Sequence, residues 1–229
     1  MDIVSDLQEV IRIMTTVYGL SFMSVVFHVL AYVVFIFLHE RRGYEPNPTT
    51  WIMFAYGDAF VALLEWSLHA PWTLLALPVV CSILSMRVAF VCWRNGSVHW
   101  PEHALDRIAL ITDIILLLTY GVITYITQLD YIDKSNREAL VTAILIITLA
   151  GAFLPFVPML RGLMENPRKE HWAPWLLWTV SYVCLTATTV LEESLLSVLM
   201  LYPVVSVVVH AVPLYVVLFF RKKESKIRP

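Results

Sequence analysis

The stretch TLLALPVVCSILSMRVAFVCW, residues 73–93, decides the fold class of this chain. Arg87 is its only charged residue. A helix that crosses a bilayer needs about 20 predominantly apolar residues, so this stretch predicts a transmembrane helix. Pro71 suits the start of that helix, and Asn95-Gly96 is a dipeptide at which helices end. We therefore expect a membrane span over residues 72–94.

The same pattern continues along the whole chain. Of its 229 residues, 59 % are apolar and 15 % are charged, and the mean hydropathy is +0.73. A soluble domain is about 45–50 % apolar and about 25 % charged. Seven spans of about 20 residues leave only short loops, which excludes a soluble enzyme, a receptor with an ectodomain and a nucleic-acid-binding protein. We predict an all-α membrane protein with seven transmembrane helices over residues 11–38, 49–69, 72–94, 104–128, 138–161, 172–190 and 195–220.

Basic residues are unequally divided between the two sides of this topology. Arg12, Lys134 and Arg137 fall on one side, whereas twelve lysines and arginines fall on the other. Cytoplasmic loops carry the excess of Lys and Arg in membrane proteins. We therefore expect an integral, multi-pass protein with its N-terminus outside and its C-terminus in the cytoplasm. Its expected surroundings are membrane lipids, a nucleic-acid partner is not expected, and a homo-oligomer is compatible with this composition.

Parts of the sequence recur in the same order. Leu64-Glu65-Trp66-Ser67-Leu68 returns as Leu191-Glu192-Glu193-Ser194-Leu195, 127 positions later. Leu77-Pro78-Val79-Val80 returns as Tyr202-Pro203-Val204-Val205, 125 positions later. Asn47-Pro48 followed by Trp51 corresponds to Asn166-Pro167 followed by Trp175. Apolar sequences produce single echoes of this kind by chance, but these three markers keep their order and their place in the topology.

The recurrence divides the seven helices into two units of three and a linker. An odd linker makes the two units run in the same direction through the bilayer, as parallel repeats do. We expect two parallel triple-helix bundles, over residues 1–94 and 138–229, joined by a linker helix and loops over residues 95–137. The second unit ends in a basic cytoplasmic tail.

This plan of three, one and three helices resembles the SWEET and PQ-loop transporter families. The local resemblance is carried by Leu154-Pro155, Pro158, the tryptophan-rich stretch 175–182 and Pro203. No Pro-Gln dipeptide occurs in the chain, and Val79 and Val204 stand where sugar transporters of that family place an asparagine. The resemblance implies a membrane transporter that binds a small solute in a pocket between the two bundles.

Ionisable residues inside the predicted spans are the first candidates for function, because such groups are costly in a membrane and usually face a cavity or a partner. Asp58, Asp113 and His210 are candidates for proton coupling, and His28 for solute binding. Each has a structural alternative. Asp58 could pair with Arg87 on the next span, Asp113 could be a structural partner on the linker helix, and each histidine could be hydrogen-bonded packing.

Aromatic residues on the second and sixth predicted spans are candidates for a solute pocket. Trp175, Trp178 and Tyr182 are spaced i, i+3 and i+7, so they share one helix face. We predict that Tyr56, Trp178 and Tyr182, with Asp58, His28 and His210, bind the solute. Trp51, Trp172 and Trp175 lie near helix starts, where an interfacial aromatic belt is the alternative.

A membrane-embedded enzyme is the alternative from another class. Seven-span terpene cyclases have a similar plan, and Asp58, Glu65 and His210 could supply acid and base chemistry to a lipid-like substrate. Nothing in the sequence predicts a cofactor, and no Cys or His spacing predicts a metal site. Every lysine lies in a predicted loop or tail, which argues against a covalent retinal chromophore.

Overall fold

The chain forms an all-helical bundle in the computed structural model, which describes residues 3–42, 48–94, 104–129, 133–153, 155–156, 159–160, 163 and 171–227. Over these residues it contains α-helices, one short 3-10 helix and no strand. The α-helices are α1 (Ile3–Arg42), α2 (Pro48–Ser67), α3 (Trp72–Arg94), α4 (Ala104–Gln128), α5 (Lys134–Gly151), α7 (Trp172–Glu192) and α8 (Leu201–Ile227), with the 3-10 helix η2 (Val198–Met200) before α8.

Within the described residues, five stretches are long and apolar enough to cross a membrane, as a multi-pass membrane protein requires. They are Met14–Leu38, Trp72–Arg94, Leu110–Gln128, Trp172–Glu192 and Val198–Phe219. The helices α2 and α5 fall outside this group for different reasons. The carboxyl groups of Asp58 and Glu65 lower the hydropathy of α2, and α5 begins with the polar run Lys134-Ser135-Asn136-Arg137-Glu138.

The end of α5 differs from the prediction. The sequence predicts a span over residues 138–161, whereas the helix ends at Gly151. Gly151 is a poor residue for a helix interior, and Pro155 lacks the backbone N–H that a continuing helix would use. Residues that follow this break, including Pro155 and Phe156, line the central cavity of the bundle.

Hydroxyl groups join the closely packed helices. The α1 helix packs along α7, and α2 packs along α3. Ser181 on α7 donates to the backbone oxygen of Ser24 on α1 over 2.8 Å, and Ser82 on α3 donates to that of Ala55 on α2 over 2.7 Å. Small residues let helices approach closely, and interhelical hydrogen bonds stabilise membrane bundles.

A tight turn joins α2 to α3. The backbone N–H of Ala70 donates to the oxygen of Glu65, and that of His69 donates to the oxygen of Trp66, each over 3.0 Å. This pair of bonds is the Schellman pattern, in which the residue after the helix adopts a left-handed conformation. His69 does so, with φ of 63°. The turn fixes the direction in which α3 returns beside α2.

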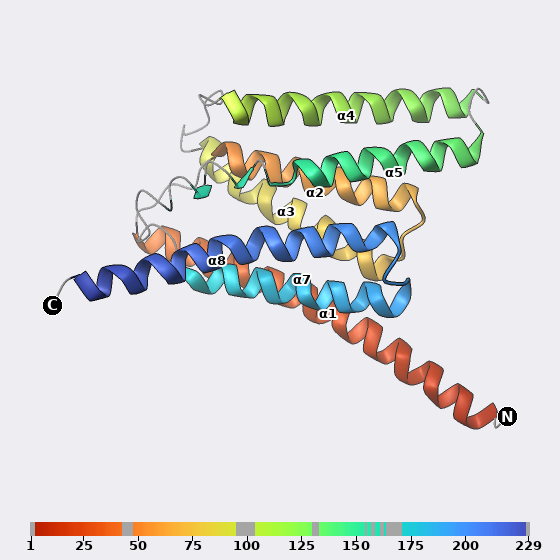
Figure 1. Ribbon diagram of the computed structural model, residues 1–229, viewed down its shortest axis with the longest axis horizontal. Helices are drawn as coiled ribbons and strands as arrows, with labels where there is room; N and C mark the ends of the chain where they lie inside the picture. The colour runs from red at the N-terminus through yellow and green to blue at the C-terminus, as the bar shows by residue number, and fades with distance from the viewer. Residues whose placement is uncertain are drawn as a thin grey trace.

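The helices do not contribute equally to the core. Figure 1 shows α4 at one edge of the bundle beside α5, with the two chain ends at opposite ends of the bundle. One buried cluster centres on aliphatic side chains and includes Leu64, Leu145 and Leu185. The other is rich in rings and includes Tyr32, Trp175 and Trp178. This second cluster forms one side of the candidate site.

Candidate functional site

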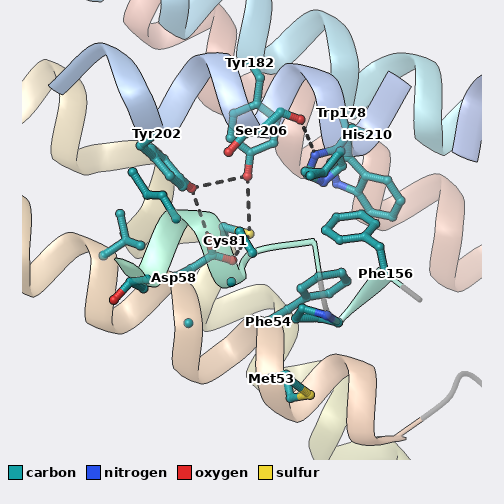
Figure 2. Close-up of a pocket in the computed structure, with 18 of the residues that line it drawn as sticks. Met53, Phe54, Asp58, Cys81, Phe156, Trp178, Tyr182, Tyr202, Ser206 and His210 are labelled. Atoms are coloured by element: carbon teal, nitrogen blue, oxygen red, sulfur yellow. Dashed lines mark hydrogen bonds between the residues drawn. The ribbon is translucent and has the colours of Figure 1, made fainter. Parts of the chain in front are cut away.

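A cavity of about 80 Å³ lies inside the bundle (Figure 2). Helices α1, α2, α3, α5, α7 and α8 all contribute to its wall, together with the segment after α5. Its lining combines aromatic rings with a few polar groups. The residues that surround it are Tyr32, Trp51, Met53, Phe54, Gly57, Asp58, Val61, Cys81, Thr148, Leu149, Gly151, Ala152, Pro155, Phe156, Trp175, Trp178, Tyr182, Tyr202, Ser206, Val209 and His210.

Asp58 is the centre of a hydrogen-bond network at this cavity (Figure 2). The Cys81 thiol on α3 donates to its Oδ2 atom over 2.7 Å, and the Tyr202 hydroxyl on α8 donates to its Oδ1 atom over 3.0 Å. The hydroxyl oxygens of Tyr202 and Tyr182 are 3.3 Å apart, which extends the network to α7. The alternative that paired Asp58 with Arg87 does not hold, because Arg87 is exposed and the partners of Asp58 are uncharged.

Aromatic rings form the opposite part of the cavity wall. Trp178 lies between Trp175, whose ring centroid is 4.9 Å away, and Tyr32, at 5.3 Å. The Trp51 ring lies 5.6 Å from Tyr32 and 6.2 Å from Trp178. Trp51 and Trp175 are 5 % and 1 % exposed, so the expectation of an interfacial belt fails for them. Trp172, at 37 % exposed, agrees with it.

The two histidines lie on either side of Tyr182. Its ring centroid is 5.4 Å from that of His28 and 4.7 Å from that of His210. The hydroxyl proton of Ser181 goes to a backbone oxygen, so the Nδ1 atom of His28, 3.2 Å from that hydroxyl, must be the donor. His28 is fully buried and does not line the cavity, whereas His210 does.

His210 is held by its own helix. Its Nδ1 atom lies 2.7 Å from the backbone oxygen of Ser206, which can only accept, so Nδ1 carries a proton. In a neutral imidazole the Nε2 atom is then a hydrogen-bond acceptor. His210 therefore supplies an acceptor group to a cavity whose other polar side is built around Asp58.

Two other predicted site residues lie away from the cavity. Tyr56 stacks on Phe60, with ring centroids 6.1 Å apart, and does not belong to the cavity wall. Asp113 lies on α4, and its side chain is outside the described part of the structure. In that part, α4 contributes no residue to the cavity wall. The proposed roles of Tyr56 and Asp113 therefore lack support from the geometry.

Glu65 is buried at the far end of α2 from the cavity. It follows Asp58 by seven residues, so both lie on the same face of the helix. Glu65 is 2 % exposed, and its Oε2 atom has no hydrogen-bond partner within the described residues. Of the three residues considered for acid and base chemistry, Asp58 and His210 line the cavity and Glu65 does not.

Sequence reasoning missed several residues of the site. Cys81 and Tyr202 bind Asp58, and the Tyr32 hydroxyl bonds to Ser85 on α3 beside them. Tyr202 immediately precedes the recurring proline, and Cys81 follows the other copy of that proline by three residues. Because a proline inside a helix loosens the backbone near it, the neighbourhood of each recurring proline was the available signal.

Two further observations bear on the chemistry. In the ranges that the structure describes, no group of three His, Cys, Asp or Glu residues could hold a metal ion. The indole N–H groups of Trp175 and Trp178 and the hydroxyl of Thr148 are buried without a hydrogen-bond partner there.

Protein-family models, curated proteins and solved structures were compared with the chain, and none matches it.

Proposed function

We propose that the protein is a membrane transporter that binds a small solute in the cavity beside Asp58. The observation that carries the proposal is the cavity itself, which lies between helices from both halves of the chain and holds an ionisable carboxyl group. Transporters built from repeats bind their substrates near the bilayer midplane, at the interface of the repeats. In this proposal the N-terminus is outside and the C-terminus is cytoplasmic.

Corresponding residues of the recurring motifs support a plan of two triple-helix bundles. Trp51 and Trp175 are the tryptophans that follow the two Asn-Pro markers, and both line the cavity. Cys81 and Ser206 are 125 positions apart, which is the spacing of the two Pro-Val-Val motifs, and both line the cavity. A SWEET-like arrangement of seven spans, with α4 as the linker, would bring such pairs together.

The interruption of α5 also supports transport. Residues Thr148, Leu149, Gly151 and Ala152, at the C-terminal end of this helix, lie against the cavity. Transporters commonly place the ends of broken helices at the substrate, where irregular backbone is tolerated because it lines a cavity. Ala152, Pro155 and Phe156 are therefore the part of the wall that we expect to move.

We further propose that solute movement is linked to protons through Asp58, with His210 as the second titratable group of the cavity wall. Asp113 is a weaker candidate because its helix lies at the edge of the bundle. The ionisable groups nearest to Asp58 come from five helices, so the proton would be shared within a network. They are Tyr32 on α1, Glu65 on α2, Cys81 on α3, Tyr182 on α7, and Tyr202 and His210 on α8.

Cys81 allows a test that requires no knowledge of the solute. The chain has three cysteines, so replacing Cys92 and Cys184 by serine leaves Cys81 as the only thiol. In proteoliposomes of known orientation, a transporter exposes the cavity to each aqueous side in turn. The cationic thiosulfonate reagent MTSET, which does not cross membranes, is therefore expected to modify Cys81 when applied from either side.

Two other labelling patterns would contradict transport. Labelling by N-ethylmaleimide, which enters membranes, together with protection from MTSET on both sides, would mean that the cavity opens to lipid and would refute transport. A variant in which Cys81 is also replaced by serine measures the background. Labelling from one side only would contradict alternating access.

A further inference from the structure

The geometry points to a small organic ammonium ion as the solute, held between Asp58 and the aromatic rings of the cavity. This inference rests on the proposed binding function and names its chemical class. The cavity has a polar side, where Asp58, Cys81 and Tyr202 meet, and an aromatic side, which includes Trp178 and Phe156 (Figure 2).

The charge balance of the cavity favours a cation. Asp58 is the only carboxylate among the described lining residues, and they include no lysine or arginine. A buried charge is costly unless it is paired. The partners of Asp58, Cys81 and Tyr202, are hydrogen-bond donors without charge. A carboxylate offers about four acceptor positions, so these two donors leave room for a third from a ligand.

The aromatic rings favour the same kind of ligand. Eight of the described lining residues are Phe, Tyr or Trp. An ammonium group placed over such a ring is attracted to its negative face, most strongly for Trp and more strongly where water is excluded. Trp178 is 2 % exposed and Tyr182 is 1 % exposed, so both rings lie in a dry part of the bundle. A neutral sugar would stack on these rings and could donate a hydrogen bond to Asp58, but it would leave the negative charge without a counter-ion.

The C-terminal end of α5 is a third feature that favours a cation. The C-terminal end of a helix carries a partial negative charge because its last carbonyl groups have no partner within the helix. The α5 helix ends at Gly151, which lies against the cavity together with Thr148 and Ala152. The carboxylate, the ring faces and the helix end all attract a cation, and no described lining side chain carries a fixed positive charge.

Cavity size limits the ligand to a few atoms. A water molecule requires about 10–15 Å³ of such space. The cavity of about 80 Å³ therefore holds about five to eight water-sized groups. Choline is a molecule of this size, with a quaternary ammonium group and one hydroxyl. The hydroxyl oxygen could accept from the indole N–H of Trp175 or Trp178, which has no partner among the described residues.

The test compares choline with 3,3-dimethyl-1-butanol, which has the same shape and the same hydroxyl but a carbon atom in place of the charged nitrogen. The readout is the rate at which N-ethylmaleimide modifies Cys81 in the otherwise cysteine-free protein, since a ligand beside Asp58 shields that thiol. We expect choline to halve the rate at a concentration at least tenfold lower than the neutral alcohol does. Equal potency of the two, or no protection by 100 mM choline, would overturn the inference.

Variants locate the effect within the cavity. Asp58→Asn and Trp178→Leu are each expected to weaken choline protection tenfold or more, and the neutral alcohol no more than threefold. Each comparison is made within one variant, so a change in the reactivity of Cys81 itself cancels. Glu193→Gln, which removes an exposed carboxylate at the end of α7, should leave protection unchanged. An equal loss for both compounds in Asp58→Asn would contradict charge pairing.

The outcomes separate this inference from transport. If MTSET reaches Cys81 from both sides but choline gives no protection, the ammonium assignment is wrong and transport stands. If choline protects but MTSET reaches Cys81 from neither side, the protein binds ammonium ions without transporting them. If glucose protects and choline does not, the cavity is a site for neutral solutes and the inference is overturned.

Discussion

Glu65→Leu is expected to stabilise the protein. The Glu65 side chain is 2 % exposed, and its Oε2 atom has no hydrogen-bond partner in the described residues. It belongs to a region whose buried neighbours, such as Leu64 and Phe60, are apolar. Leucine is similar in volume to glutamate and carries no polar atom, so the replacement removes a desolvated group without opening a large cavity.

The size of the effect follows from the environment of the carboxyl group. A buried polar atom without a partner costs about 1–3 kcal/mol. For a chain of this length, 1 kcal/mol shifts Tm by about 2–4 °C. We therefore expect Glu65→Leu to raise Tm by about 2–12 °C in detergent, measured by a thermal shift assay at a fixed scan rate.

The recurring motif provides a matched control. Glu192 stands at the position that corresponds to Glu65, but it is only half-buried and accepts a hydrogen bond from the Thr73 hydroxyl. Glu192→Leu removes this bond and should lower Tm by about 2–4 °C. If both substitutions lower Tm, Glu65 has a stabilising partner, and the inference that its carboxyl group destabilises the fold is wrong.

Two smaller predictions concern the elements around α2. The Ser67 hydroxyl lies 2.6 Å from that of Tyr120 and joins α2 to α4, so Ser67→Ala should destabilise the protein by about 1 kcal/mol. Adding Tyr120→Phe to this variant should cause no further loss of stability. Additive losses in this double-mutant cycle would contradict the pairing. His69 is exposed and adopts φ of 63°, a left-handed backbone conformation that costs free energy for a residue with a side chain. His69→Gly should therefore raise Tm by about 2–4 °C for each kcal/mol of backbone strain that it relieves. A fall in Tm would contradict the left-handed turn.

Helix boundaries could be predicted from the sequence where nearby residues such as proline, asparagine and glycine determine them. The predicted span over 72–94 is the helix Trp72–Arg94, because its limits follow from Pro71 and Asn95-Gly96. The fifth predicted span is interrupted, because α5 ends at Gly151 and helical residues return at Phe156, Met159 and Leu160. Apolar residues continue beyond Gly151, and hydropathy alone could not show that the helix ends there to line a cavity.

The ionisable residues of the site were also found from the sequence, because a charge at membrane depth stands out in an apolar helix. Their partners were not. Cys81 and Tyr202 look like ordinary members of apolar helices, and they meet Asp58 only because α3 and α8 approach α2 in the folded bundle. The choice between pocket and interface for Trp51 was open in the sequence for a similar reason, since its burial depends on α1 and α7.

Cavity volume bears on the choice between transport and a cyclase. The aromatic rings and Asp58 would suit a carbocation as well as an ammonium ion, so the chemistry of the wall alone does not separate the two. A lipid-like substrate needs a much larger space, because pockets for drug-sized ligands measure about 300–1,000 Å³. The cavity measures about 80 Å³, and Glu65, the second acid that a cyclase could use, is not part of its wall. A polar solute of a few heavy atoms fits that space, which is why a small cation is the ligand that size and charge favour together.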